Sequence, residues 1–404
     1  MKKLFFFFLT MYVATGCSGT KKESDQLANT EKETTEVKAS SPVVPVWYDG
    51  EIPLIFNVDE DYPETNIRLS DLSEALYIPL ATSDNLLLRQ VGTCNGNEYL
   101  LTNDLIYAQE EETSIFVFRK DGSFVREICH QGGGPGEYHY ISSYAVDTLR
   151  QEIFVQDANL RNGKTLVYDL EGNLKRTFPN RAKEIALLND SLLINYFQYN
   201  PGGPRYSVTR KEDGSTVKKL PIRFPTKLPH DSHGRLSYGS LIKSPKGVFL
   251  SNLGNDTIFE IRPDLQVLPR LIDISKYPTN FAQIHPTIET ARYLMFYILR
   301  CHSYKPRVDE HFYIYDKKEK QIYKMTDYPD NSYWRLMDDY PHITNWTTTQ
   351  NSHVAVRTRQ VYALMQAEGK HGDAQLKRLI ETLDEDANPV LQVMIFHSVD
   401  QVKK

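Results

Sequence analysis

The stretch that decides the fold class of this chain is Phe116-Val117-Phe118-Arg119-Lys120-Asp121-Gly122-Ser123-Phe124-Val125, and residues 166–175 repeat its pattern. An apolar run meets a polar turn with glycine, and a second apolar run follows, which is the pattern of a β-hairpin. Weaker copies centre on Asp213-Gly214, Pro263-Asp264 and Lys318-Glu319. Successive turns lie about 50, 42, 50 and 55 residues apart, a period typical of the four-stranded blades of a β-propeller.

Short apolar runs bounded by turn residues continue along the chain, which indicates an all-β fold with two exceptions. Residues 284–299 carry apolar side chains at helix-compatible spacing and predict a short helix or an inserted loop. Residues 354–383 are also helix-compatible and predict helical insertions near the C-terminus. Residues 390–396 then predict a terminal strand that closes the ring with strands from the other end of the chain. A small separate C-terminal cap is the alternative.

The N-terminal residues form a secretory signal. Met1-Lys2-Lys3 is basic, and the apolar stretch at residues 4–13 is too short to span a bilayer as a permanent helix. The segment Ala14-Thr15-Gly16-Cys17 resembles a bacterial lipobox, which implies a signal peptide over residues 1–16 and a diacylated Cys17. Several acyl chains would anchor the chain firmly to a membrane. An ordinary signal peptide followed by a chance cysteine is the alternative.

The chain after the signal is expected to have two parts. Residues 17–46 hold the lipidated cysteine and a segment of Lys, Glu, Thr and Ser, which cannot bury enough apolar surface to fold and therefore predicts a flexible tether. Residues 47–404 are expected to form one six-bladed β-propeller, because large all-β folds of this length are often single domains. No compact acidic run follows the cysteine, which favours a periplasm-facing location at the outer membrane over the cell surface.

Composition narrows the classes of partner. A net charge of −5 and a pI near 6.2 provide no basic field for nucleic acid. Cys94, Cys129 and Cys301 are widely spaced and lack a metal-binding pattern, so we interpret them mainly as buried thiols, with one disulfide left open. No cofactor is expected.

A loop rich in glycine follows the first clear repeat, at Gln131-Gly132-Gly133-Gly134-Pro135-Gly136-Glu137-Tyr138, and the segment Val155-Gln156-Asp157-Ala158-Asn159-Leu160-Arg161 comes after it. This succession resembles the blades of NHL-repeat propellers. Together with the lipobox and the pattern Leu383-Asp384-Glu385-Asp386-Ala387-Asn388-Pro389-Val390, the chain resembles six-bladed β-propeller lipoproteins of the Bacteroidetes type. Those families largely lack an assigned activity, so the resemblance implies a fold more than a ligand.

Polar and aromatic residues near predicted loops are candidates for ligand contacts. The glycine loop could line the mouth of the central channel, or it could be a tight crossover in which Glu137 caps backbone amides. Asp157 and Arg161 could contact a ligand or link blades. Large rings beside polar neighbours suit a sugar or a protein partner, although most rings in all-β folds pack between sheets. The ligand-binding candidates are Glu137, Tyr138, Asp157, Arg161, Arg292, Tyr297 and Arg335.

Histidines are the candidates for a metal site, namely His130, His230, His233 and His302. A channel could gather them from different blades, and NHL-like propellers include a lyase that uses a bound metal. No nucleophile elbow is present in the sequence. The leading hypothesis is therefore a lipid-anchored, non-catalytic binding or scaffold module for a glycan, a peptide or an envelope protein. The alternative is a metal-assisted lyase or hydrolase with its site in the central channel.

Overall fold

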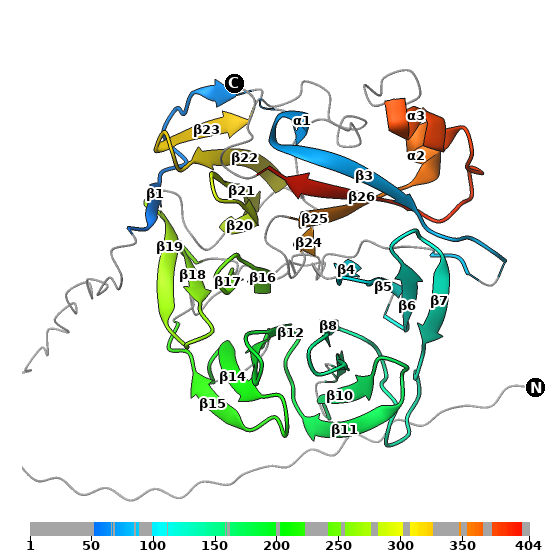
Figure 1. Ribbon diagram of the computed structural model, residues 1–404. Coiled ribbons are helices and arrows are strands. Elements are labelled where there is room, and N and C mark those ends of the chain that lie inside the picture. The colour runs from blue at the N-terminus through cyan, green and yellow to red at the C-terminus, as the bar shows by residue number, and fades with distance from the viewer. Residues whose placement is uncertain are drawn as a thin grey trace, which may run out of the picture. The chain divides into compact units, whose positions relative to one another are not determined.

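The computed structural model describes residues 52–65, 67, 69–84, 86–88, 99–110, 112–157, 159, 162–198, 203–222, 241–251, 255–275, 282–301, 308–325, 347–348, 354–366 and 374–397. Six sheets are arranged around a central axis as the blades of a propeller (Figure 1). The prediction of an all-β, six-bladed β-propeller is confirmed. In this part of the chain, no helix is long and apolar enough to cross a membrane.

Each blade has four antiparallel strands, and contacts between the first strands of neighbouring blades place these strands around the axis. The strands of blades 1 to 5 are, in order, β4 (Tyr99–Leu101), β5 (Leu105–Glu110), β6 (Ser114–Arg119) and β7 (Phe124–Ile128); β8 (Ser143–Asp147), β9 (Glu152–Asp157), β10 (Lys164–Asp169) and β11 (Leu174–Pro179); β12 (Glu184–Leu187), β13 (Leu192–Tyr196), β14 (Tyr206–Arg210) and β15 (Thr216–Lys219); β16 (Leu241–Lys243), β17 (Val248–Leu250), β18 (Thr257–Ile261) and β19 (Val267–Asp273); β20 (Ala282–Glu289), β21 (Tyr293–Cys301), β22 (Val308–Asp316) and β23 (Gln321–Met325).

Blade 6 closes the ring, as the terminal apolar run predicted. It contains β24 (Thr347–Thr348), β25 (Val354–Arg359) and β26 (Val390–Phe396), and its fourth strand is β3 (Ser73–Pro79) from the opposite end of the chain. Asn388 strengthens this closure, since its amide nitrogen donates to the carbonyls of Ala81 and Leu86 at 2.7 and 2.8 Å. The strand belongs to a blade, so the separate C-terminal cap is not formed.

The residues before β3 form a strap along the outside of two blades. β1 (Leu54–Phe56) pairs in parallel with β19, and β2 (Glu64–Thr65) pairs in parallel with β23. The helix α1 (Leu69–Leu72) then leads into β3. We call residues 54–65 the N-terminal strap. Because it supplies a fifth strand to blades 4 and 5, it covers the outer edges of both sheets.

The prediction of a helix or an inserted loop at residues 284–299 is wrong. This segment forms most of β20 and β21. Leu294, Phe296 and Ile298 pack with residues of blade 4, whereas Tyr293 and Met295 pack toward blade 6. A strand buried on both faces is apolar at consecutive positions, so its sequence pattern cannot be separated from that of a buried helix.

The helical insertions predicted near the C-terminus are confirmed, although residues 354–359 are strand β25. The two helices are α2 (Val361–Gln366) and α3 (Ala374–Ile380), and both lie between β25 and β26. Their buried residues Leu364, Leu376 and Ile380 pack with Tyr77 of β3 and Val390 of β26. The helices therefore cover part of blade 6.

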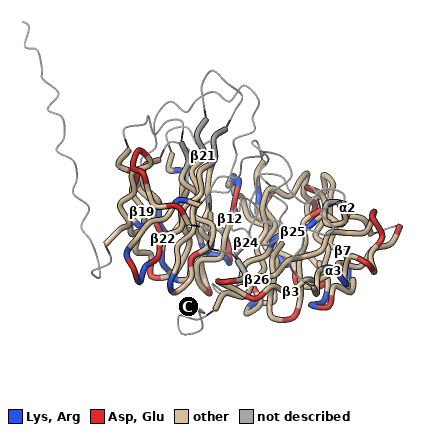
Figure 2. Tube along the Cα trace, turned by 90° about the horizontal axis from the view of Figure 1, so that it is seen from above, with Lys and Arg blue, Asp and Glu red and all other residues tan. Residues whose placement is uncertain are grey.

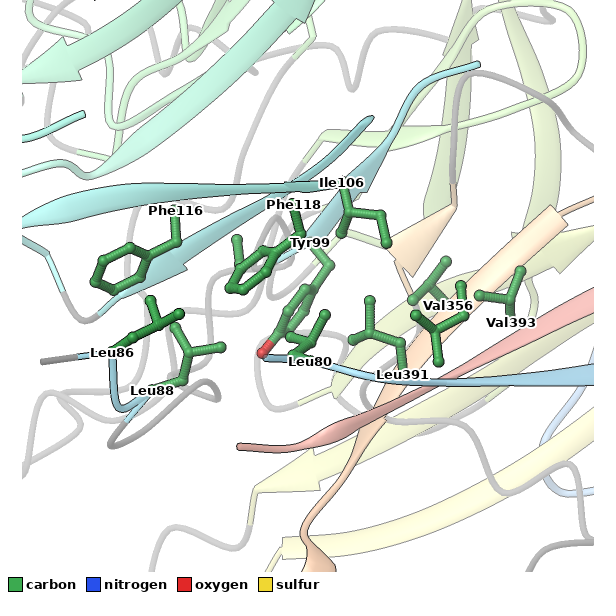
Figure 3. Packing of buried hydrophobic residues seen from close by; sticks show 12 residues of the cluster. Leu80, Leu86, Leu88, Tyr99, Ile106, Phe116, Phe118, Val356, Leu391 and Val393 are labelled. Carbon is green, nitrogen blue, oxygen red and sulfur yellow. The ribbon is translucent and has the colours of Figure 1, made fainter. Parts of the chain in front are cut away.

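The hydrophobic core lies between blades. Figure 3 shows the cluster in which side chains of blade 6 face those of blade 1. Further clusters occupy the other spaces between neighbouring blades that the structure describes. Since both faces of a blade pack against neighbours, the ring buries apolar side chains from both faces of its strands.

The five repeated turns of the sequence are confirmed as hairpins between third and fourth strands. Gly122, Gly172 and Gly214 have φ of +85°, +96° and +73°, the left-handed region that favours glycine. Each glycine also packs against the preceding blade, where the nearest atoms belong to Pro79, Ile128 and Phe178, respectively. The repeat therefore serves both the hairpin and the contact between blades.

Gly122→Ala should destabilise the protein because its new Cβ would lie 1.9 Å from the carbonyl oxygen of Pro79 and the backbone would be strained. We expect a loss of about 1–3 kcal/mol in the free energy of unfolding, measured by urea denaturation. Gly133→Ala is the control, since nothing lies within 4 Å of its added Cβ. Equal stability of the two variants would contradict this role of Gly122.

Candidate functional site

Strand connections define two ends of the propeller. Hairpins between the first and second strands and between the third and fourth strands leave the strands at one end, which we call the turn end. Connections between second and third strands, and the crossovers between blades, leave at the opposite end, which we call the loop end. Figure 2 shows Lys and Arg interspersed with Asp and Glu along the described trace.

The glycine loop is a crossover at the loop end between blades 1 and 2. As one sequence interpretation predicted, the carboxylate of Glu137 caps the loop and accepts the Gly134 backbone N–H at 2.7 Å. Tyr138 is buried, donates its hydroxyl to the carbonyl of Thr113 at 2.8 Å and accepts the backbone N–H of His130 at 3.0 Å. Both candidates therefore hold the crossover in shape.

His130 joins blade 1 to blade 2. Its Nε2 lies 2.8 Å from the carbonyl oxygen of Gly172, and its ring stacks on Tyr168 with centroids 4.8 Å apart. The other metal candidates, His230, His233 and His302, lie outside the described residues. Among the residues that are described, no group of three or more His, Cys, Asp or Glu side chains is placed to hold a metal ion.

Asp157 links the crossover to the end of β9. Its fully buried carboxylate accepts the backbone N–H of His139 at 3.1 Å through Oδ2, which also lies 3.1 Å from Nδ1 of that ring. Oδ1 has no hydrogen-bond partner among the described residues. Arg161, which the sequence placed with Asp157, lies outside the described residues, as do Arg335 and Cys17.

Two other candidates lie within blade 5. Arg292 sits in the hairpin between β20 and β21, donates to Asp316 at 2.7 and 2.9 Å and lies over the ring of Tyr293. Tyr297 is 1 % exposed and packs against His285 and Phe312, so its ring does not reach a rim.

The interpretation of the cysteines as buried thiols is wrong for Cys129, which is exposed and free. Cys129 directly follows β7, the outermost strand of its blade, in which Phe124 and Glu127 are also exposed.

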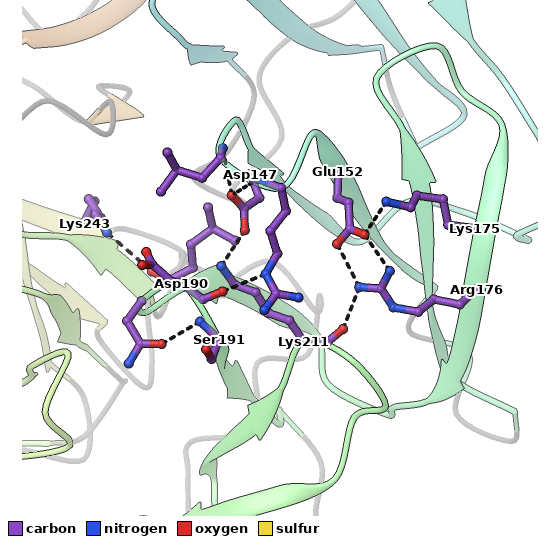
Figure 4. A network of polar contacts seen from close by, with 12 residues as sticks. Asp147, Glu152, Lys175, Arg176, Asp190, Ser191, Lys211 and Lys243 are labelled. Atoms are coloured by element: carbon purple, nitrogen blue, oxygen red, sulfur yellow. Dashed lines mark hydrogen bonds and ion pairs between the residues drawn. The ribbon is translucent and has the colours of Figure 1, made fainter.

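Charged side chains at the turn end pair across blades 2 and 3 (Figure 4). Lys211 Nζ lies 2.6 Å from Asp147 Oδ2, and both side chains are almost fully buried. Burial acts to raise the pKa of Glu152, but hydrogen bonds from Arg176 and Lys175 outweigh it and lower that pKa to about 2. The Lys211–Asp147 pair links blades 2 and 3, whereas Glu152, Lys175 and Arg176 all lie in blade 2. Arg176 reaches blade 3 through the backbone carbonyls of Lys211 and Glu212.

Sequence reasoning missed these links, although the repeat contained a signal. The fourth residue after each repeat glycine is basic, at Arg126, Arg176 and Lys218. Each donates to a backbone carbonyl in the corresponding turn of the next blade, namely that of Leu170, Glu212 and Leu265, at 3.2, 3.0 and 2.7 Å. A basic residue at constant spacing from a turn could have indicated contacts between repeats.

A cavity of about 490 Å³ lies at the loop end of blade 2. Residues 162–164 and 177–181 line it, from the ends of β10 and β11 and the connections beside them. Its volume falls within the range of small-molecule sites in proteins. Of the predicted site residues that the structure describes, none lines this cavity, because they were chosen from motifs and aromatic runs.

One solved structure supports the fold, and a second resembles it less. A Bacteroides fragilis protein described as exported is 17 % identical, with a TM-score of 0.62 over 86 % of this chain and 100 % of that one. BamB from Moraxella catarrhalis is 10 % identical, with a TM-score of 0.43 over 77 % of this chain and 100 % of that one.

No curated protein sequence matches this chain. One family, described as a domain of unknown function, DUF4934, matches residues 53–395, which include all six blades and the N-terminal strap. The chain belongs to this family.

Proposed function

We propose that this protein is a lipid-anchored, non-catalytic binding or scaffold module of the cell envelope, and that its loop end contacts the partner. The difference between the two ends carries this proposal. Turn-end hairpins such as residues 148–151 and 170–173 are short, whereas the loop-end connections include residues 80–98, 129–142 and 360–389. Loops that a rigid scaffold positions are the usual sites of binding.

Cys17 supplies the anchor in this proposal. Its lipobox-like context and the apolar stretch before it support diacylation, and the absence of a compact acidic run supports the periplasmic side of the outer membrane. A glycan, a peptide or an envelope protein is the proposed partner.

Cys17→Ser is expected to abolish incorporation of labelled palmitate and to release the protein from the membrane fraction. Cys129→Ser is the matched control, because Cys129 is an exposed free thiol within the propeller. Labelling of the Cys17→Ser variant at the wild-type level would contradict the lipid anchor.

The binding role predicts site-dependent cross-linking in intact cells. A photoreactive amino acid at Gly133, in the exposed glycine loop, should capture the partner, whereas the same residue at Leu149 should not. Leu149 is 80 % exposed in the hairpin between β8 and β9 at the turn end, so access to both probes is comparable. Equal capture from both positions, or capture from neither, would count against binding through the loop end.

A further inference from the structure

The cavity at the loop end of blade 2 has walls that are held in place by internal hydrogen bonds. The Asn180 backbone N–H donates to the Gly163 carbonyl at 2.9 Å, which joins the two connections that flank the cavity. The Asn180 side chain is buried and donates to Thr165 Oγ1 at 3.0 Å and Asn195 Oδ1 at 2.8 Å. A site that is ordered before binding loses little entropy when a ligand enters.

Gly163 lets the two connections approach closely. A Cβ at this position would lie 2.7 Å from the Asn180 carbonyl oxygen and 2.9 Å from that of Asn159. Because these are backbone atoms, they could not move aside without shifting the walls. The shape of the cavity therefore depends on glycine at this position.

Positive charge prevails around the cavity. Lys164 and Arg181 line it, and among the described residues no carboxylate forms an ion pair with Lys164. Asp157 is the cross-strand neighbour of Lys164, and its carboxylate oxygen Oδ2 lies 3.1 Å from Nδ1 of His139. Among the residues that the structure describes, the Lys164 ammonium therefore supplies positive charge at the cavity, which favours an anionic ligand.

The remaining lining suits a sugar ring. Thr177 and Pro179 are exposed on β11 and share one face of the sheet, because side chains two residues apart in a strand point the same way. The Thr177 hydroxyl can form hydrogen bonds with the hydroxyl groups of a pyranose, and the apolar ring of Pro179 can pack against its C–H face. Pro179 also pairs with Lys164 in the ladder, so apolar surface and cation are adjacent.

We infer that this cavity binds a carboxylate-bearing sugar, with Lys164 as the main contact for the carboxylate. The inference rests on and deepens the proposed binding function, since it names the chemistry of a ligand at the loop end. A bare inorganic anion would use the cations but leave the apolar part of the lining unused.

Titration calorimetry of the full-length chain in detergent tests whether the cavity binds such a sugar. The ligands are a galacturonic acid trimer, a neutral galactose trimer and inorganic phosphate. We expect the acidic trimer to bind and the neutral trimer to bind at least about tenfold more weakly, because charge-assisted hydrogen bonds are the strong ones. Lys164→Ala should weaken binding of the acidic trimer about tenfold or more. Lys219→Ala, at an exposed lysine on the outer strand of blade 3, should leave it unchanged.

Several results would overturn the inference: equal binding of both trimers, displacement of the acidic trimer by equimolar phosphate, or wild-type affinity in Lys164→Ala. Gly163→Ala should also lose binding of the acidic trimer. If Gly163→Ala fails to fold, Lys164→Ala still tests the inference. Absence of sugar binding with retained cross-linking from Gly133 would refute this site and leave the proposed function standing. Loss of both sugar binding and cross-linking from Gly133 would refute the sugar site and the proposed function.

Discussion

Replacing Phe56 by alanine is expected to lower the free energy of unfolding by about 3–5 kcal/mol, the usual cost of emptying the space of a buried phenylalanine. Phe56 is completely buried although it lies in the three-residue strand β1. Its ring meets those of Tyr313, Phe296 and Tyr62 at centroid distances of 4.7, 5.2 and 5.4 Å. It therefore fills a space between the strap and the blades beneath it.

Guanidinium denaturation measures this loss, and Ile55→Ala is the control. Ile55 is the preceding residue of the same strand and is 47 % exposed, so its truncation should cost far less. If Phe56→Ala unfolds at the same denaturant concentration as Ile55→Ala, the strap does not stabilise the ring. If Phe56→Ala unfolds in a single transition at a lower guanidinium concentration than the wild type, the strap unfolds together with the ring.

Lys211→Met is expected to destabilise the protein by about 3–5 kcal/mol, because it leaves the buried carboxylate of Asp147 without its counter-charge. Oδ1 of Asp147 would keep the backbone N–H groups of Leu149 and Arg150, both at 3.1 Å, but Oδ2 would lose its 2.6 Å partner. The pair joins β8 of blade 2 to the hairpin after β14 of blade 3 (Figure 4).

A double-mutant cycle separates the cost of an unpaired charge from the net contribution of the pair. Asp147→Asn combined with Lys211→Met should be more stable than Lys211→Met alone, since no buried charge remains. Lys175→Met is the control, because that side chain is 39 % exposed in its contact with Glu152 and should contribute less than about 1 kcal/mol. Additive effects in the cycle would show that the two residues act independently.

Much of the architecture could be predicted because the repeat is a local pattern. The hairpin around Gly122 needs a left-handed residue, and that need is visible in the sequence as glycine after a polar turn. The closing strand at residues 390–396 was also predictable, since a ring must pair its two ends. The role of Glu137 as a cap followed from the glycines that precede it.

Other features depend on which segments meet in space. The β20–β21 hairpin was mistaken for a short helix or an inserted loop because both of its faces are buried by other blades. The N-terminal strap could not be predicted, because its partners β19 and β23 are more than two hundred residues away in the chain. The cavity of blade 2 was missed because it is formed by ordinary residues of two separate connections.

By itself, the sequence determined the repeat, the all-β class, the closure of the ring and the expectation of an exported, lipidated start. Each of these depends on local periodicity or on a contiguous motif, and such patterns survive in a linear string. Tertiary structure alone decided that Phe56 fills a space beneath the strap, that Lys211 meets Asp147, and that Lys164 stands beside Thr177 and Pro179 at one cavity. These contacts join residues from different strands or blades, and only the folded ring brings their side chains within reach of one another.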